Sequence, residues 1–313
     1  MVMKSVSRLI TDNALAEPDR PAITHEGSTI TREELDLTTN RLAREYKRLG
    51  VREGDMVTIA LPNSIEFYEA CIATWKLGAT PQPISARLPT IEREAIVELA
   101  NPSIVVGGIP GSHGNRTVLP IGHIPDKTLS SDSLEDKTAK FWKAPTSGGS
   151  TGRPKIIVSE NPGAFDFDVA LPLRQEKNRA QLVTGPLYHN GPFSFSMNGL
   201  YLGNHIIVMT RFDSEQTLQL IEQYKIDWLM MVPTMMLRIW KLPEASRNQY
   251  DLSSLRVMLH LAAPCPPWLK EEWINWLGGE RVHELFGGTE GTGATWITGD
   301  EWMHHKGSVG KLM

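Results

Sequence analysis

The sequence has few cysteines, no excess of basic residues and no long apolar run, and each shortage excludes a class of protein. Its two cysteines, Cys71 and Cys265, form no Cys-x-x-Cys pair, which argues against a disulfide scaffold or a structural zinc site and fits a reducing compartment. The formal net charge of -4 argues against a dedicated nucleic-acid surface, because such surfaces are basic.

Membrane insertion and secretion are not expected either. The longest apolar stretches, such as 226–233, are far shorter than the ~20 residues that span a bilayer. The stretch 1–20 has no apolar core followed by a small-residue cleavage site, so we expect no secretory signal. These features predict a cytoplasmic protein without a membrane span or a nucleic-acid partner.

What the sequence does contain is an alternation of helix-like and strand-like segments. Residues 31–50 predict an amphipathic helix that begins with a capping box formed by Thr31 and Glu34. A buried strand is predicted at 55–62, and Asn63 is expected to cap the helix that follows it. Further strand-like runs, each next to a helix-like segment, occur at 205–209, 226–233, 256–263 and 281–288.

This alternation predicts an α/β fold with two similar subdomains, in which mostly parallel sheets are flanked by helices. The expected boundaries place residues 1–140 with part of 180–210 in one subdomain, and 141–180 with 211–313 in the other. Ligands of such sheets bind at the carboxyl ends of the strands. The glycine-containing turn that follows 281–286 is therefore a candidate site.

The loop at 145–158, PTSGGSTGRPKIIV, allows several kinds of chemistry. Its Gly-x-Ser-x-Gly pattern suggests a hydrolase nucleophile at Ser150, but Pro154 and the strand-like run after it occupy the place where such a turn needs a helix. The spacing also fails to match a Walker phosphate loop. An anion-binding nest and a plain surface loop remain open. In the nest, glycine amides, hydroxyl groups and Lys155 would surround a phosphate.

A second stretch, ELFGGTEG, follows a predicted strand. Phe286 can stack on a nucleobase, Gly287 and Gly288 permit close approach of the backbone, and the Thr289 hydroxyl can hold a phosphate. The Glu290 carboxylate is a suitable ligand for Mg²⁺, which prefers oxygen. Taken alone, a carboxylate such as Glu290 is more often a solvated surface group than a metal ligand.

Together these stretches resemble the adenylate-forming superfamily of acyl-CoA synthetases, luciferases and peptide-synthetase adenylation domains. SGGSTGRPK comes first and FGGTE follows, in the order that is typical of that superfamily. GPLYHNGPF resembles its acyl-gating segment, LHLAAPCPP its adenine turn and HKGSVGK a short motif near the end. The resemblance extends from about residue 8 to the end of the chain.

The resemblance implies a role for each matching position. Residues that would hold the ATP phosphates are Ser147, Gly148, Gly149, Ser150, Thr151, Gly152 and Lys155. Residues that would surround the adenine are Ala262, Ala263, Pro264, Glu284, Phe286, Gly287 and Gly288. Thr289 would contact the α-phosphate and Glu290 would bind Mg²⁺. Residues that would line the acyl pocket are His189, Phe193, Met231 and Gly288. Catalysis would depend on Lys155, His189, Thr289 and Glu290.

The implied activity is ATP-dependent conversion of a carboxylic acid to acyl-AMP, followed by thioester formation with CoA. The motifs are most similar to those of ligases for fatty, alicyclic or steroid-like acids. Two alternatives stay open: an enzyme that passes acyl-AMP to a carrier protein or an amine, and a silent binding subunit that needs a partner chain. Homodimer formation also stays open.

The sequence departs from the superfamily pattern at its end. Relatives continue well beyond the position of Met313 and supply a mobile C-terminal lid domain. The expectation is therefore a partial N-terminal adenylation domain over 1–313, with the lid missing or on another chain. TGDEW resembles the ribose-binding motif but lies too close to Glu290, so Asp300 is not assigned that role.

Overall fold

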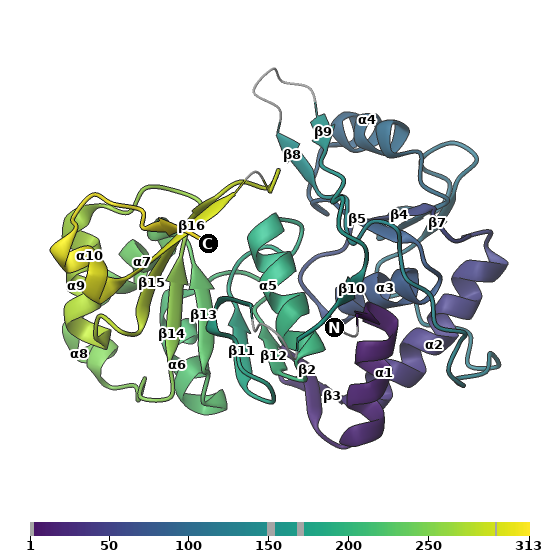
Figure 1. The fold of residues 1–313 in the computed structure, drawn as a ribbon. Helices are drawn as coiled ribbons and strands as arrows, with labels where there is room; N and C mark the ends of the chain where they lie inside the picture. The colour runs from purple at the N-terminus through teal and green to yellow at the C-terminus, as the bar shows by residue number, and fades with distance from the viewer. Residues whose placement is uncertain (1–2, 149–153, 168–171, 292) are drawn as a thin grey trace.

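The structure, a computed structural model, describes residues 3–148, 154–167, 172–291 and 293–313 (Figure 1). Its helices are α1 (Val6–Ala16), α2 (Arg32–Arg48), α3 (Ile65–Lys76), α4 (Thr90–Ala100), α5 (Asn190–Tyr201), α6 (Ser214–Tyr224), α7 (Pro233–Trp240), α8 (Glu244–Asn248), α9 (Pro267–Leu277) and α10 (Gly299–His304). Within these described ranges, no helix combines the length and apolarity that crossing a membrane requires.

The strands of the described residues form two large sheets and two short ribbons. In spatial order the nine-stranded sheet contains β17 (Lys311–Leu312), β16 (Ala294–Thr298), β15 (Val282–Gly287), β14 (Val257–His260), β13 (Trp228–Met231), β11 (Ala180–Val183), β12 (His205–Val208), β2 (Pro21–His25) and β3 (Ser28–Thr31). The four-stranded sheet contains β5 (Thr80–Pro83), β4 (Met56–Ile59), β6 (Ile104–Val106) and β7 (Thr117–Leu119). The ribbons pair β1 (Lys4–Ser5) with β10 (Ala164–Phe165) and β8 (Thr146–Gly148) with β9 (Pro154–Ile156).

Parallel pairing dominates both large sheets. The four-stranded sheet is parallel throughout, and the larger sheet is parallel from β15 to β2, with β16, β17 and β3 antiparallel at its edges. Strands of a parallel sheet are covered on both faces, which explains why β13 and β14 are buried along their whole length. The predicted α/β fold with mostly parallel sheets and flanking helices is confirmed.

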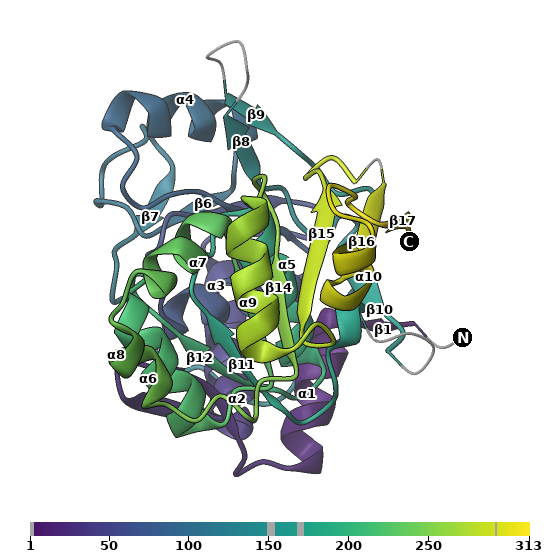
Figure 2. The same ribbon diagram turned by 90° about the vertical axis from the view of Figure 1, so that its left-hand side faces the viewer.

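Two hydrophobic cores lie on opposite faces of the larger sheet. One is shared with the four-stranded sheet and includes Phe67 of α3 and Phe193 of α5. The other packs the sheet against α6, α7 and α9 (Figure 2). Because β2 and β3 pair with strands from the second half of the chain, the N-terminal segment belongs partly to the larger sheet. The predicted subdomain boundaries stay a prediction.

The sequence predicts the N-terminal cap of α2 correctly and that of α3 incorrectly. Thr31 and Glu34 form the predicted capping box of α2. The cap of α3 is Ser64, whose hydroxyl accepts from the Phe67 amide, so the prediction of Asn63 as the cap is wrong. Asn63 is buried and donates to the carbonyls of Gly185 and Met209. Its Oδ1, the atom that a helix cap would use, accepts from the Leu187 amide at 2.8 Å, so Asn63 joins the end of β4 to the larger sheet instead of capping α3.

Candidate active site

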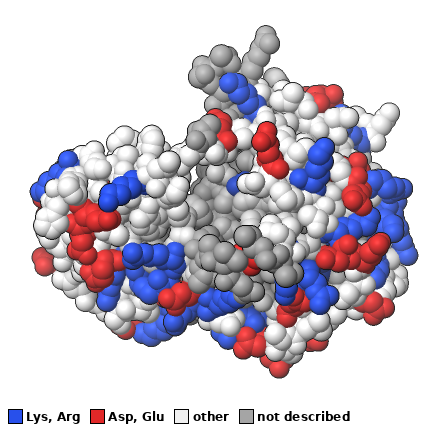
Figure 3. Space-filling view, viewed as in Figure 1, with Lys and Arg blue, Asp and Glu red and all other residues white. Residues whose placement is uncertain are grey.

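The carboxyl ends of β13, β14 and β15 meet at one edge of the larger sheet because these strands are parallel neighbours. Figures 1 and 2 both show the β8–β9 ribbon at the same end of the molecule as the tip of β15. The surface over the β14–β16 side of this end is largely uncharged in Figure 3. The two predicted nucleotide segments therefore lie at the end where parallel sheets bind ligands.

The turn after β15 is open to solvent. The Phe286 ring is 63% exposed although it belongs to a strand, so its face is free to stack on a ligand. The Gly291 amide donates to the Gly288 carbonyl across the turn, at 3.2 Å. A Cβ on Gly288 would lie 3.0 Å from Oε2 of Glu290, so glycine leaves that exposed carboxylate unobstructed.

The turn after β14 is strained. Ala262 has a φ of 72°, a left-handed conformation that favours glycine. Ala263 and Pro264 follow it and are exposed. The predicted adenine turn thus projects from the sheet beside Phe286, since β14 and β15 are neighbours.

Glu284 lies two residues before Phe286 on β15 and has a buried partner. Nζ of Lys270, on α9, lies 2.5 Å from Oε2 of Glu284 and 4.6 Å from the centroid of the Trp302 ring. Lys270 is 1% exposed, and burial lowers the pKa of its ammonium while Glu284 opposes that shift. Sequence reasoning missed Lys270, because a lysine in an amphipathic helix is usually assigned to the solvent face.

The predicted phosphate segment forms the β8–β9 ribbon, with Ser147 opposite Lys155 and Gly148 opposite Pro154. The Lys155 side chain is exposed. Gly149, Ser150, Thr151 and Gly152 lie outside the described residues. Because a strand follows this segment, the strand–turn–helix geometry of a hydrolase nucleophile is not formed.

His189 begins α5 as its N-cap residue, with an exposed side chain. Partial desolvation lowers the pKa of its imidazole, and the Tyr188 ring lies 4.3 Å away. Phe193, one turn further along, is fully buried, with the rings of Phe67 and Trp75 about 6 Å from its own. Within this helix, His189 is thus accessible to a ligand and Phe193 is part of the core.

Met230, rather than Met231, shares a face with α5. A Cβ on Gly191 would lie 3.2 Å from the Met230 sulfur and 3.7 Å from Leu261. Met231 packs on the opposite face, in the core beneath α6 and α7. Met230, Leu261 and Phe195 belong to a small apolar cluster at the carboxyl ends of β13 and β14. Gly191, two residues after His189, lies against Met230 and Leu261, which makes this cluster a candidate for an acyl pocket wall.

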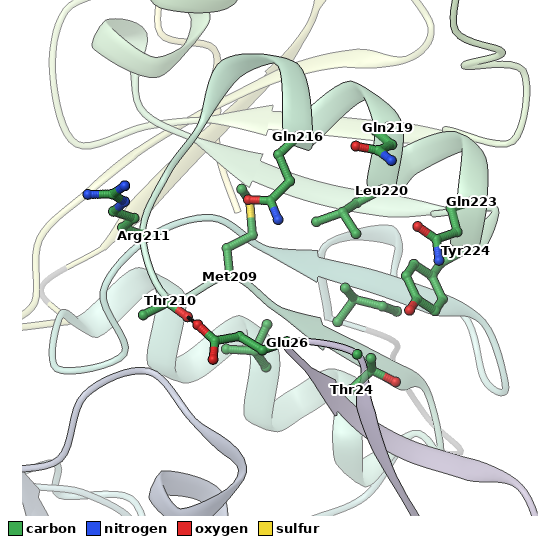
Figure 4. A pocket seen from close by; sticks show the side chains of 13 residues that line it. Thr24, Glu26, Met209, Thr210, Arg211, Gln216, Gln219, Leu220, Gln223 and Tyr224 are labelled. Carbon is green, nitrogen blue, oxygen red and sulfur yellow. Dashed lines mark hydrogen bonds between the residues drawn. The ribbon is translucent and has the colours of Figure 1, made fainter.

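A separate cavity of about 330 Å³ lies between the β2–β3 turn, the end of β12 and α6 (Figure 4). Figure 4 shows three glutamine side chains of α6, Gln216, Gln219 and Gln223, lining it opposite Glu26. The predicted site residues are not among those that line it. It is a feature distinct from the β14–β15 edge.

Residues 10–313 match the sequence profile of the family described as AMP-binding enzyme. The chain belongs to the AMP-binding enzyme family. Its curated relatives include 4-coumarate–CoA ligase CCL1 of Humulus lupulus, which is 27% identical over a match that covers 87% of this chain and 55% of the relative. A feruloyl-CoA synthase of Amycolatopsis is 26% identical, with 84% and 55% covered. The chain thus spans about half the length of these curated family members.

Solved structures in the same comparison share the fold of this AMP-binding family chain. The N-terminal domain of FACL13 from Mycobacterium tuberculosis has a TM-score of 0.85 and 20% identity, covering 99% of this chain and 83% of that one. The o-succinylbenzoate CoA synthetase of Bacillus subtilis, in complex with its acyl-adenylate intermediate, has a TM-score of 0.82 and 22% identity, covering 100% and 65%. The resemblance read from the sequence motifs is confirmed at the level of family and fold.

Proposed function

We propose that this chain activates a carboxylic acid with ATP, forming acyl-AMP and pyrophosphate, as part of an acyl-CoA synthetase. The observation that carries the proposal is the family match over 10–313, within which the exposed Phe286–Glu290 turn lies at the carboxyl edge of the sheet. Relatives named as ligases of CoA with 4-coumarate and ferulate support CoA as the acceptor.

The adenine of ATP would stack on the exposed face of Phe286. The turn after β14 would frame its other side, and the carboxylate of Glu284 could accept from the adenine amino group through the oxygen that Lys270 leaves free. Residues proposed for this pocket are Ala262, Ala263, Pro264, Glu284, Phe286, Gly287 and Gly288.

The phosphates would lie between the β8–β9 ribbon and the β15 turn. Residues proposed to bind them are Ser147, Gly148, Gly149, Ser150, Thr151, Gly152, Lys155 and Thr289. Among the described residues no three His, Cys, Asp or Glu side chains gather around one point, so the exposed Glu290 would hold Mg²⁺ together with phosphate oxygens, a donor set that suits this ion. Mg²⁺ would supply charge neutralisation of the phosphates.

The acid would enter beside His189 and Gly288, against the apolar wall of Met230, with Phe193 and Met231 supporting that wall from the core. One carboxylate oxygen would attack the α-phosphorus, and the bond from that phosphorus to the bridging oxygen of pyrophosphate would break. Lys155 and the amides of the β15 turn would stabilise the negative charge that develops on the phosphate oxygens.

The test is acid-dependent release of pyrophosphate with Mg²⁺-ATP, measured with and without CoA. The panel should contain 4-coumarate, ferulate, o-succinylbenzoate and fatty, alicyclic and steroid-like acids. We expect release with at least one bulky apolar acid, and conversion of that acid to its thioester when CoA is present. Tight AMP binding without any release would instead indicate a binding subunit.

Glu290→Gln tests the metal assignment. We expect a loss of pyrophosphate release of at least about tenfold, because a neutral amide is a poorer ligand for Mg²⁺. Glu280→Gln alters an exposed carboxylate two residues before β15 and is the matched control, which should retain the wild-type rate. Unchanged Mg²⁺ dependence in Glu290→Gln would remove Glu290 from the site.

A further inference from the structure

Lys143 is a buried lysine that holds the base of the β8–β9 ribbon against α5. It is 8% exposed. Its Nζ donates to Oδ1 of Asn190, at 2.5 Å, and to Oγ of Ser194. The centroid of the Trp142 ring lies 4.3 Å from Nζ. Among the residues that the structure describes, no carboxylate forms an ion pair with this ammonium.

The ribbon is longer than its two strands. Below β8 and β9, the amides of Ile157 and Ser159 donate to the carbonyls of Pro145 and Lys143, at 2.9 Å each. The Trp142 amide donates to the Asn161 carbonyl, which closes the ladder at its base. A displacement of Lys143 is therefore transmitted along paired backbone to Ser147 and Lys155.

The partners of Lys143 belong to the start of α5. Asn190 and Ser194 are one helical turn apart, and His189 is the N-cap residue directly before Asn190. The far end of α5 is tied to the same ribbon, because Nε1 of Trp142 donates to the Tyr201 hydroxyl at 3.1 Å. One short segment thus fixes both ends of the helix that carries His189.

We propose that Lys143 is a positioning residue for acid activation, because its amino group fixes the first turn of α5, and with it His189, relative to the ribbon that carries Lys155. This inference rests on the proposed function. The acid and the phosphates would approach from these two elements, so their relative position sets the distance between the attacking oxygen and the α-phosphorus. Small errors in such a distance reduce the rate of reaction more than they reduce binding.

The strength of the hydrogen bonds from Lys143 to Asn190 and Ser194 depends on whether the Lys143 amine is protonated. Burial lowers the pKa of this amine to about 7. The titratable groups of α5 are His189 and Tyr201, and Glu160 follows Ser159 in the segment that faces Lys143. The α3 helix contacts this segment through the uncharged Trp75, whose Nε1 donates to the Trp142 carbonyl, and its charged residues are Glu66, Glu69 and Lys76. Deprotonation removes the charge-assisted hydrogen bonds and the contact with the Trp142 ring.

The experiment compares Lys143→Met with Lys140→Met, an exposed lysine three positions earlier. We expect Lys143→Met to lower kcat for acyl-AMP formation at least tenfold while the Kd values of acid and ATP, each measured alone, change less than threefold. Lys140→Met should match the wild type. An unchanged kcat in Lys143→Met, or equal losses in kcat and in both affinities, would overturn the positioning role.

Asn190→Asp gives Lys143 a carboxylate partner and tests the charge itself. In the wild type, kcat should decline as the pH rises through about 7, and Asn190→Asp should move that decline to higher pH because a carboxylate stabilises the ammonium. A decline that stays in place in Asn190→Asp would refute the role of the charge.

Amide hydrogen exchange separates this inference from the proposed function. We expect faster exchange at 190–194 in Lys143→Met than in Lys140→Met, whether or not the protein turns over any acid. If the wild type activates no acid, the proposed function fails, while the exchange result still decides whether Lys143 fixes α5. Equal exchange in the two variants would show that it does not.

Discussion

Two lysines of the candidate active site are both buried, yet they meet different partners. Lys270, behind β15, forms an ion pair with Glu284. Lys143, at the base of the ribbon, meets the neutral acceptors Asn190 and Ser194. Lys76 resembles Lys270, because it pairs with Asp36 at 2.7 Å inside the N-terminal core.

The difference in partners determines how readily each buried lysine loses its proton. A buried ion pair is costly to break, because removing one partner leaves a charge without compensation. A buried ammonium among neutral acceptors instead relieves its cost by losing the proton, which is why its pKa falls. In the β14–β15 region the Glu284 carboxylate opposes the lowering of the Lys270 pKa by burial. The ribbon base lacks such a carboxylate among the described residues and should change its charge near pH 7.

The largest effect is expected when Lys270 loses its carboxylate partner and, like Lys143, has no ion pair. Glu284→Gln removes the carboxylate and should lower the free energy of unfolding by about 3 kcal/mol. Urea unfolding monitored by tryptophan fluorescence measures this loss. Glu280→Gln alters an exposed carboxylate near the start of the same strand, and its cost should stay below about 0.5 kcal/mol. Equal costs for the two variants would show that the ion pair stabilises nothing.

The next effect concerns the titration of Lys143. The unfolded lysine binds its proton up to about pH 10.5 and the folded one up to about pH 7, so the unfolded state holds more protons between these values. The free energy of unfolding of the wild type should therefore rise by about 2.7 kcal/mol between pH 6 and pH 9 through this group. The Lys143→Met variant should lack this rise. The difference between the free energies of unfolding of wild type and variant, measured across this pH range, gives its size. Parallel profiles would contradict the lowered pKa.

In the Lys270 region, the titration of His260 should affect the free energy of unfolding at acidic pH. It is fully buried, and burial, helped by the Lys270 charge, lowers the pKa of its imidazole to about 3. Between pH 6.5 and 3 the unfolded state binds the extra proton, so this histidine lowers stability as the pH falls. At pH 5.5 the loss should be about 1 kcal/mol relative to pH 7.5. His260→Phe should reduce the loss, whereas the exposed His304→Phe should leave it unchanged.

Local patterns in the sequence predicted the elements that depend on neighbours along the chain. The capping box of α2 and the exposed turn after β15 are of this kind. The hydrogen bonds of Lys143 join it to residues 47 and 51 positions further along the chain, and no local sequence pattern predicts contacts at that separation. β13 is buried on both faces, so its sequence carries no alternation that would distinguish Met230 from Met231.

The smallest expected effect compares the backbones of two turns at the sheet edge. After β15 the left-handed position is filled by Gly291, with a φ of 70°, whereas after β14 it is filled by Ala262, with a φ of 72°. The strain of a left-handed alanine, roughly 1–2 kcal/mol, exceeds the roughly 0.5–1 kcal/mol that glycine costs through the unfolded chain. Ala262→Gly should therefore raise the free energy of unfolding by about 0.5 kcal/mol.

Ala263→Gly is the matched control, because Ala263 lies in the same exposed turn and does not have a positive φ. That variant should lose about 0.5 kcal/mol, since the glycine gains freedom in the unfolded chain and relieves no strain. Thermal unfolding of both variants in one buffer measures the opposite signs. A loss in Ala262→Gly equal to that in Ala263→Gly would mean that the turn after β14 is unstrained, and that the two turns differ in sequence but not in backbone energy.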